Sequence, residues 1–321
     1  MRPSAEPRIR MPVYADGIED YVAMFRAQPA APDMAQMRLF GDLGGARFAE
    51  GLNPRVRRFD SQIAAAKREI PLRIYDPGGT GARPAICYFH GGGFSLGSIE
   101  SFDVIGAMLA ESTGAVVASV EYRRLPDADY REAQADCDEG FAWLVRQAGT
   151  LNIDPDHVVL AGDSAGALLA FTTAANMRDT HGDVPAGLLL FYGTFAMDAG
   201  SEDYFASDDP LLTQLRIRQY IALFQRCGGV AHHHAPIDRT DLAGLPPTHI
   251  VAAEHDPLRA EAERMGSRLA QAGVQTSLRM APGMIHGFLR AVAVSAPARE
   301  ELADAAAAIA PWLHSAEARN A

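Results

Sequence analysis

Gly162-Asp163-Ser164-Ala165-Gly166 lies directly after the apolar run His157 to Ala161 and before a stretch with the composition of a helix. Its pattern is G-x-S-x-G, in which a strand turns sharply into a helix and holds one serine on the turn. A Cβ atom at either glycine would crowd such a turn. The stretch therefore predicts a strand–turn–helix unit with Ser164 as a candidate nucleophile.

Short β-rich runs and helix-length segments alternate from Arg55 onward. Central runs such as Ala85–Phe89 are almost continuously apolar, as parallel strands covered on both faces are. The alternation predicts an α/β fold with a mostly parallel, doubly wound eight-stranded sheet and helices on both faces. The first two strands follow each other without a helix, which predicts a hairpin at one edge. We expect strands at Arg55–Phe59, Leu72–Tyr75, Ala85–Phe89, Ala115–Tyr122, Val158–Ala161, Gly187–Phe191, His249–Ala253 and Thr276–Met280, and helices near Phe102–Ser112, Arg131–Gln147, Ala165–Arg178, Ala260–Ala272 and Glu300–Ser315.

Two segments, residues 1 to about 50 and 194 to about 235, do not follow this alternation. We expect them to meet as a helical cap over the carboxyl edge of the sheet, where ligands bind in open α/β folds. Ordinary peripheral helices are the alternative. The first segment has helical patterns at Ile18–Arg26 and Asp33–Phe40 and an expected break at Gly41–Gly45; the second has Asp208-Asp209-Pro210 and a helical pattern at Thr213–Gln225.

Two candidate partners for Ser164 follow later strands. His286 lies in the loop Pro282–Phe288, and Asp256 comes immediately after the run His249–Ala253. A serine hydroxyl needs a base to take its proton, and that base needs an acid to orient it and to stabilise the imidazolium. All three side chains fall just past the carboxyl ends of strands, which predicts a triad of Ser164, His286 and Asp256.

A glycine-rich loop, His90-Gly91-Gly92-Gly93, directly follows the strand Ala85–Phe89. Its backbone N–H groups can approach a ligand without obstruction by side chains. With the N–H of Ala165, those of Gly91 and Gly92 are the expected donors to an oxyanion. Phosphate binding is disfavoured because neither G-x-x-x-x-G-K-[ST] nor G-x-G-x-x-G is present.

Taken together, these motifs resemble the hormone-sensitive-lipase-like carboxylesterases (bacterial family IV) of the α/β-hydrolase superfamily. The resemblance covers the chain from about Arg55 to its end. It implies Ser164, Asp256 and His286 as the catalytic triad, Gly91, Gly92 and Ala165 as the oxyanion hole, and hydrolysis of short-to-medium acyl esters through an acyl-enzyme. The matching stretches are Tyr88–Phe94, Val120–Arg123, Gly162–Gly166, Glu254–Leu258 and Pro282–Phe288.

The resemblance also implies a cap, and the break in the strand–helix alternation divides the chain accordingly. Residues 1–50 would form an N-terminal cap segment, and residues 51–321 an α/β-hydrolase catalytic domain with a second cap insertion at about 194–235. The chain also departs from the family pattern, which bears on pocket shape and on the support of the Asp256 loop. Ala167-Leu168 replace glycine and asparagine, Arg124-Leu125 replace leucine and alanine, and Ala260 replaces aspartate.

Composition narrows the partners. The formal charge of the protein is −11, which disfavours nucleic acid and anionic membranes as partners. The expected partner is a small-molecule ester, and its hydrolysis by a serine requires no cofactor and no metal. Cys87, Cys137 and Cys227 form no C-x-x-C, so reduced thiols in the cytoplasm are expected. Residues 1–30 lack the apolar core of a signal peptide, and no stretch is long enough for a membrane anchor. A homodimer is left open.

Several side chains near these motifs are expected to be structural. Asp163 is expected to pin the turn, His90 to brace the glycine loop, and His255 to pack at the surface. The run His232-His233-His234 lacks a carboxylate or cysteine at ligand spacing, so no metal site is expected.

Two other functions remain open. The same triad could hydrolyse amides or lactones or transfer an acyl group to an alcohol. A small-molecule receptor on this fold is the alternative of a different class, but such a receptor would not need His286 in its full Gly-Met-Ile-His-Gly-Phe context.

Overall fold

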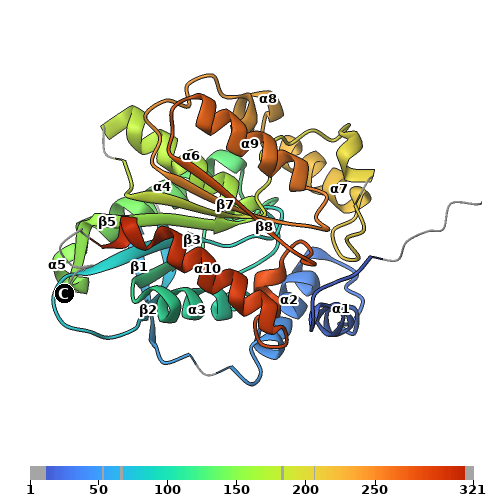
Figure 1. Ribbon diagram of the computed structural model, residues 1–321, viewed down its shortest axis with the longest axis horizontal. Coiled ribbons are helices and arrows are strands. Elements are labelled where there is room, and N and C mark those ends of the chain that lie inside the picture. The colour runs from blue at the N-terminus through green and yellow to red at the C-terminus, as the bar shows by residue number, and fades with distance from the viewer. Residues whose placement is uncertain (1–11, 53, 66–67, 182–183, 206, 315–321) are drawn as a thin grey trace, which may run out of the picture.

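An eight-stranded sheet with the order β1-β2-β4-β3-β5-β6-β7-β8 runs through the computed structural model (Figure 1). The structure describes residues 12–52, 54–65, 68–181, 184–205 and 207–314. β2 is antiparallel to both neighbours, β1 and β4, and the remaining pairs are parallel, which confirms the predicted edge hairpin and the α/β class. The strands are β1 Arg57–Ala65, β2 Arg68–Asp76, β3 Arg83–Phe89, β4 Val116–Val120, β5 Ile153–Asp163, β6 Gly187–Phe191, β7 Thr248–Ala253 and β8 Thr276–Ala281.

Helices cover both faces of the sheet (Figure 1). α4, α6 and α9 enclose one apolar core, and α3 and α10 enclose the other. β4, β6 and β7 are buried along their whole length, which explains why their sequences are apolar without alternation. The helices are α1 Ile18–Arg26, α2 Met34–Phe48, α3 Asp103–Thr113, α4 Tyr130–Arg146, α5 Ala148–Leu151, α6 Ala165–His181, α7 Gln214–Arg226, α8 Ala231–His234, α9 Arg259–Gln271 and α10 Ala296–Leu313, with short 3-10 turns at Glu202–Phe205, Pro236–Asp238 and Phe288–Ala291.

One boundary differs from expectation in the central strand. β5 begins at Ile153 rather than near Val158. The sequence missed this start because residues 154–157 are at least partly exposed and are mostly polar, so they lack the pattern of a buried strand. The register against β3 shifts between Arg83 and Ala85, where the two strands start to pair regularly. The apolar half that leads to Ser164 is the part that the sequence predicted.

The expected break at Gly41–Gly45 is wrong, because α2 continues through these glycines to Phe48. A Cβ atom at Gly45 would lie 2.5 Å from the Cα atom of Ser101, so this glycine lets the helix approach the segment that leads into α3. Gly45 therefore serves close packing, and this packing offsets its low helix propensity.

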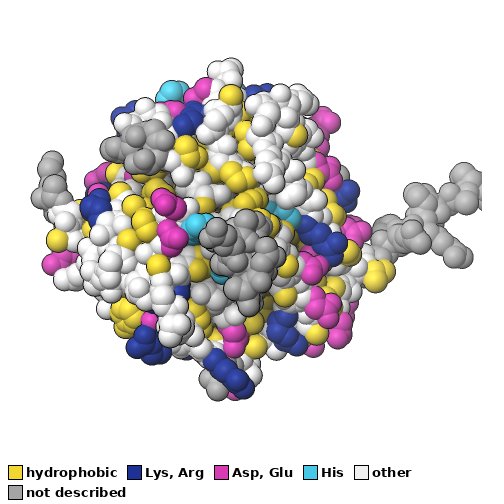
Figure 2. Space-filling view, turned by 60° about the vertical axis from the view of Figure 1, so that its left-hand side comes forward, with side chains coloured by type: hydrophobic (Ala, Val, Ile, Leu, Met, Phe, Trp, Pro, Cys, Tyr) yellow, Lys and Arg dark blue, Asp and Glu magenta, His cyan; other side chains and the backbone are white. Residues whose placement is uncertain are grey.

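Three helices from distant parts of the chain, α1, α2 and α7, lie at the same end of the sheet (Figure 1). Both segments that break the strand–helix alternation thus come to one side of the molecule. Acidic and basic side chains are interspersed on the face in Figure 2. Within the part of the chain that the structure describes, no helix is long and apolar enough to cross a membrane.

Candidate active site

Ser164 stands on a strained turn between two regular elements. β5 ends at Asp163, α6 begins at Ala165, and the φ angle of Ser164 is 54°, in the left-handed region that non-glycine residues rarely adopt. The Ser164 N–H donates to the carbonyl of Phe191 at 2.9 Å. Added Cβ atoms at Gly162 and Gly166 would overlap backbone atoms. The glycine-flanked turn therefore fixes the serine by close backbone packing, as its pattern predicts.

A chain of hydrogen bonds joins Ser164, His286 and Asp256. The Ser164 Oγ atom lies 2.8 Å from His286 Nε2, and His286 Nδ1 lies 2.8 Å from Asp256 Oδ2. Asp256 follows β7, and its Oδ1 atom accepts the N–H of Leu258 at 2.8 Å. Because the carboxylate is only 4% exposed, its charge acts on the imidazole with little screening by water. The three predicted side chains are thus brought together at the carboxyl ends of their strands.

The charge balance around His286 favours imidazolium. Burial by itself lowers the pKa of His286, but the charge and hydrogen bond of Asp256, with the charges of Asp209 and Asp163, raise the pKa above its usual 6.5. The ring also meets the edge of Tyr192, at 5.0 Å between centroids. When His286 takes a proton from Ser164, the surrounding carboxylates would therefore stabilise the imidazolium that forms.

Asp163 joins the serine turn to the glycine-rich loop. Its Oδ1 atom accepts the Gly91 N–H at 2.7 Å and the Tyr88 hydroxyl at 2.6 Å. Burial raises the pKa of Asp163 to about 6. The bond to Asp163 uses the N–H of Gly91, so the expectation that Gly91 is an oxyanion donor is corrected. Gly91 instead fixes the loop.

The other N–H groups beside Ser164 are unengaged. Those of Gly92, Gly93 and Ala165 have no acceptor among the described residues. Gly92, Gly93, Ser164 and Ala165 all line the same cavity. Gly93, which the sequence reasoning did not single out as a donor, thus stands where Gly91 was expected. The sequence feature that could have indicated Gly93 is its place as the third glycine of the same loop.

His90 braces this loop from behind. It is fully buried, its Nδ1 atom donates to the Gly91 carbonyl at 2.8 Å, and its ring stacks on Tyr122 at 4.4 Å between centroids. The Tyr122 hydroxyl donates to the His90 carbonyl at 2.7 Å. Burial lowers the pKa of His90 to about 3, so the ring is neutral at physiological pH. A neutral, stacked ring does not compete with His286 as a base.

Asp209 is a residue of this site that the sequence reasoning missed. Its Oδ2 atom accepts the backbone N–H of His286 at 2.6 Å, and its Oδ1 atom accepts the N–H groups of Leu211 and Leu212, each at 2.8 Å. Burial and the nearby Asp256 raise the pKa of Asp209. In the sequence Asp209 stands in an Asp-Asp-Pro stretch, and this pattern does not reveal that its carboxylate reaches a loop 77 residues away.

A second buried acid, Glu261, supports the segment after β6. It is 0% exposed and accepts the N–H groups of Phe195 and Ala196, each at 2.7 Å, as well as the Tyr204 hydroxyl. Burial raises the pKa of Glu261. Glu261 follows Ala260, the position where the family has aspartate. α9 therefore still carries an acid, and this acid bonds the segment after β6.

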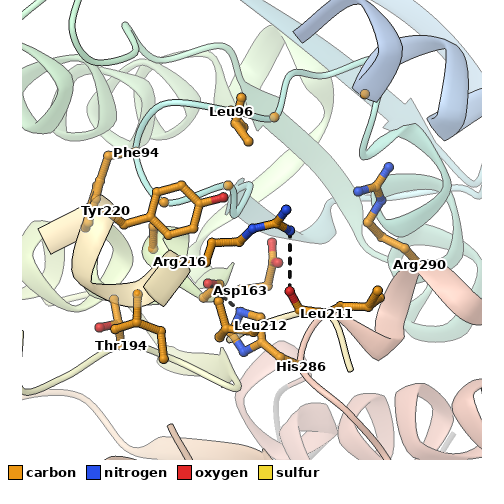
Figure 3. Close-up of a pocket in the computed structure, with 18 of the residues that line it drawn as sticks. Phe94, Leu96, Asp163, Thr194, Leu211, Leu212, Arg216, Tyr220, His286 and Arg290 are labelled. Atoms are coloured by element: carbon orange, nitrogen blue, oxygen red, sulfur yellow. Dashed lines mark hydrogen bonds between the residues drawn. The ribbon is translucent and has the colours of Figure 1, made fainter. Parts of the chain in front are cut away.

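A cavity of about 200 Å³ opens above Ser164 and His286 (Figure 3). Its lining is mainly apolar and comes from α1, α2, α7 and the loops after the strands. Most of its apolar wall is supplied by the two segments that break the strand–helix alternation. These wall residues are Tyr21, Phe25, Met37, Met197, Leu211, Leu212, Ile217, Tyr220 and Ile221.

The remaining histidines lie elsewhere. His255 Nε2 donates to the Val13 carbonyl at 3.2 Å and its ring packs against Tyr14. His234 Nδ1 accepts the N–H of Val230 at 2.8 Å. Among the residues that the structure describes, no three His, Cys, Asp or Glu side chains are grouped to hold a metal ion.

Comparisons with known proteins show the family of this chain. A family model described as alpha/beta hydrolase fold matches residues 86–290. Carboxylesterase NlhH of Mycobacterium tuberculosis is 33% identical over 254 residues, covering 77% of this chain and 79% of that protein, and an arylesterase of Saccharolobus solfataricus is 32% identical over 236 residues, covering 72% and 76%. A hyperthermophilic esterase of the archaeon Pyrobaculum calidifontis has a TM-score of 0.85 at 29% identity, over 94% of this chain and 98% of that chain. The chain therefore belongs to the α/β-hydrolase fold family, among the hormone-sensitive-lipase-like carboxylesterases.

Proposed function

We propose that this ester hydrolase works by acyl transfer through Ser164, with His286 as base and Asp256 as the acid that orients it. The observation that carries the proposal is the unbroken chain of 2.8 Å contacts from Ser164 Oγ through His286 to Asp256. His286 takes the Ser164 proton as Oγ attacks the ester carbonyl, and then gives it to the leaving alkoxide. A water activated by His286 releases the acid from the acyl-enzyme.

The charge that develops on the carbonyl oxygen needs donors that are already in place. The N–H groups of Gly92, Gly93 and Ala165 fill this role in the proposal, because they are unengaged among the described residues and line the cavity with Ser164. Preorganised donors of this kind typically contribute about 10²–10³-fold each to the rate. Gly91 and Asp163 hold the loop that carries two of them.

The segments at residues 1–50 and about 194–235 act in this proposal as a cap. Their side chains supply most of the apolar wall over Ser164, and Asp209 in the second segment bonds the loop that carries His286. The cytoplasmic location expected from the cysteines and the open question of a homodimer stay predictions. A pure receptor is disfavoured because the whole hydrogen-bonded triad is present.

We expect a preference for short-to-medium acyl chains. The cavity of about 200 Å³ is below the range of about 300–1,000 Å³ that holds drug-sized ligands. The carboxylesterase and arylesterase relatives support an ester substrate. Initial rates on p-nitrophenyl esters from acetate to palmitate should peak at or below about eight carbons. A maximum at palmitate would contradict this chain-length preference.

Asp209→Asn should shift the acid limb of the rate profile to lower pH. The imidazole must be neutral to accept the Ser164 proton, so activity is lost as pH falls through the pKa of His286. Asp256, Asp209 and Asp163 are the charges that raise this pKa, and removing one of them lowers it. The measurement is kcat/KM for p-nitrophenyl butyrate between pH 5 and 9.

The neighbouring Asp208→Asn is the matched control, because Asp208 is exposed and Asp209 is buried. Its acid limb should coincide with that of the parent protein. Equal shifts in the two variants, or no shift for Asp209→Asn, would show that Asp209 does not act on the base.

A further inference from the structure

Two arginines line the otherwise mainly apolar cavity over Ser164 (Figure 3). Arg216 comes from α7 in the second cap segment, and Arg290 comes from the 3-10 turn Phe288–Ala291 that follows the His286 loop. Figure 3 shows the two guanidinium groups side by side, with Leu211 below the gap between them and His286 below Arg216. The cavity thus carries two positive charges in a protein whose formal net charge is −11.

Arg290 has no acidic partner in the part of the chain that the structure describes. Its Nε and Nη2 atoms are buried without a hydrogen-bond acceptor among the described residues. The guanidinium instead stacks on Phe48 and Phe102, with its Cζ atom 4.6 and 5.0 Å from the ring centroids. Such stacking holds the plane of the guanidinium. Nη1 is not among the buried atoms and has no acceptor among the described residues, so it is the N–H group that can meet a ligand in the cavity first.

Other partly buried arginines of this chain are paired differently. Arg73 reaches carboxylate oxygens of Asp60 and Glu100 at 2.6 and 2.7 Å, and Arg83 pairs with Asp76. A cation withdrawn from water is costly unless an anion or acceptor compensates it. Arg290 is therefore compensated less well than arginines of similar burial, at a place where a ligand would bind.

Arg216 is also available to a ligand. Within the described chain its guanidinium contacts one acceptor, the Leu211 carbonyl, which lies a long 3.4 Å from Nη1, and it forms no ion pair there. The nearby acids are engaged by other groups. Asp163, which lines the cavity, accepts from Gly91 and Tyr88. Asp209 and Asp256, which adjoin His286, accept from backbone N–H groups and from the His286 ring.

We propose that the natural substrate is an ester that also carries a carboxylate, and that Arg290, with Arg216 from the cap, binds this carboxylate. The guanidinium fork matches a carboxylate in a bidentate way, and the apolar wall accommodates the carbon chain between the two groups. The inference rests on the proposed acyl transfer at Ser164, because hydrolysis of the ester is the step that the arginines would serve.

The test compares isosteric pairs of substrates in which a carboxylate replaces a terminal methyl group. Monomethyl adipate against methyl hexanoate places the charge on the acyl side, and 4-acetoxybutanoate against butyl acetate places it on the alcohol side. Hydrolysis is followed by pH-stat titration, and the readout is the ratio of kcat/KM for the charged ester to that for the neutral ester. Turnover of the neutral esters tests the proposed function separately.

We expect a ratio above one for at least one pair in the parent protein. Arg290→Gln should lower that ratio by about 10–100-fold, the usual effect of losing a hydrogen bond to a charged group. Arg216→Gln should lower it by a smaller factor, because this side chain is exposed. Arg290→Lys should retain part of the preference, since it keeps the charge and loses the fork.

Arg218→Gln is the matched control. Arg218 also lies on α7 but does not line the cavity, and its Nε atom donates to the Ala199 carbonyl at 3.1 Å. Both kcat/KM values should be unchanged in this variant. The proposal is overturned if both substrate pairs show ratios at or below one, or if Arg290→Gln and Arg218→Gln give the same ratio as the parent. A thermal unfolding curve for each variant separates loss of fold from loss of preference.

Discussion

Ser164→Ala will lower kcat for p-nitrophenyl butyrate by about 10⁶-fold, the scale seen when a triad nucleophile is removed. The Oγ atom that would bond the acyl carbon is lost, and the 2.8 Å contact to His286 Nε2 is lost with it. The proposed oxyanion donors and the cavity remain, so a small rate above the uncatalysed reaction should persist. Stopped assays at high enzyme concentration, with a burst measurement for acyl-enzyme, provide the readout.

Ser267→Ala is the control for this variant. Ser267 lies on the exposed part of α9, and its hydroxyl donates only to the Glu263 carbonyl, at 3.0 Å. It should keep the parent activity and unfolding temperature. A Ser164→Ala protein that is folded and still turns over ester within tenfold of the parent would remove Ser164 from the role of nucleophile.

Asp256→Asn is expected to lower kcat by about 10⁴-fold with little change in KM. An amide N–H in place of Asp256 Oδ2 would donate to His286 Nδ1, and the ring would then carry its proton on Nε2. That tautomer faces Ser164 with a donor and cannot accept the serine proton. The charge that stabilises imidazolium is lost in the same step.

A second Asp–His pair in the chain offers a control. Asp154 Oδ2 lies 2.9 Å from His157 Nδ1 at the partly exposed start of β5, away from the cavity lining. Asp154→Asn should leave kcat within about twofold. If Asp256→Asn behaves like Asp154→Asn, the acid of the site lies elsewhere, and Asp209 would be the next residue to substitute.

The parts of the site that depend on local patterns could be predicted from the sequence. The turn at Ser164, the loop at His90 and the loops carrying Asp256 and His286 each follow an apolar strand, and parallel strands deliver such loops to one edge. Element types were confirmed for the same reason, since the periodicities of buried strands and amphipathic helices are local.

What the sequence could not supply are contacts between segments far apart in the chain. The Gly91 N–H is taken by Asp163 across 72 residues, and Asp209 reaches His286 across 77 residues. The continuation of α2 through Gly45 was missed because this glycine is favoured by close packing on Ser101. Helix propensity describes local preference and contains no information on such packing. Arg216 and Arg290 were not singled out, since the partners of a guanidinium are known only once its surroundings are known.

The bond between Asp209 and the N–H of His286 has a consequence for exchanging parts among relatives. The acceptor lies in the proposed second cap segment, and the donor lies in the loop that carries His286. A chimera that takes its second cap segment from a relative, in order to alter specificity, would gain or lose this acceptor with the segment. The exchange would therefore change the surroundings of His286 as well as the cavity lining. In such grafts, selectivity and turnover would vary together unless an acid is retained at position 209.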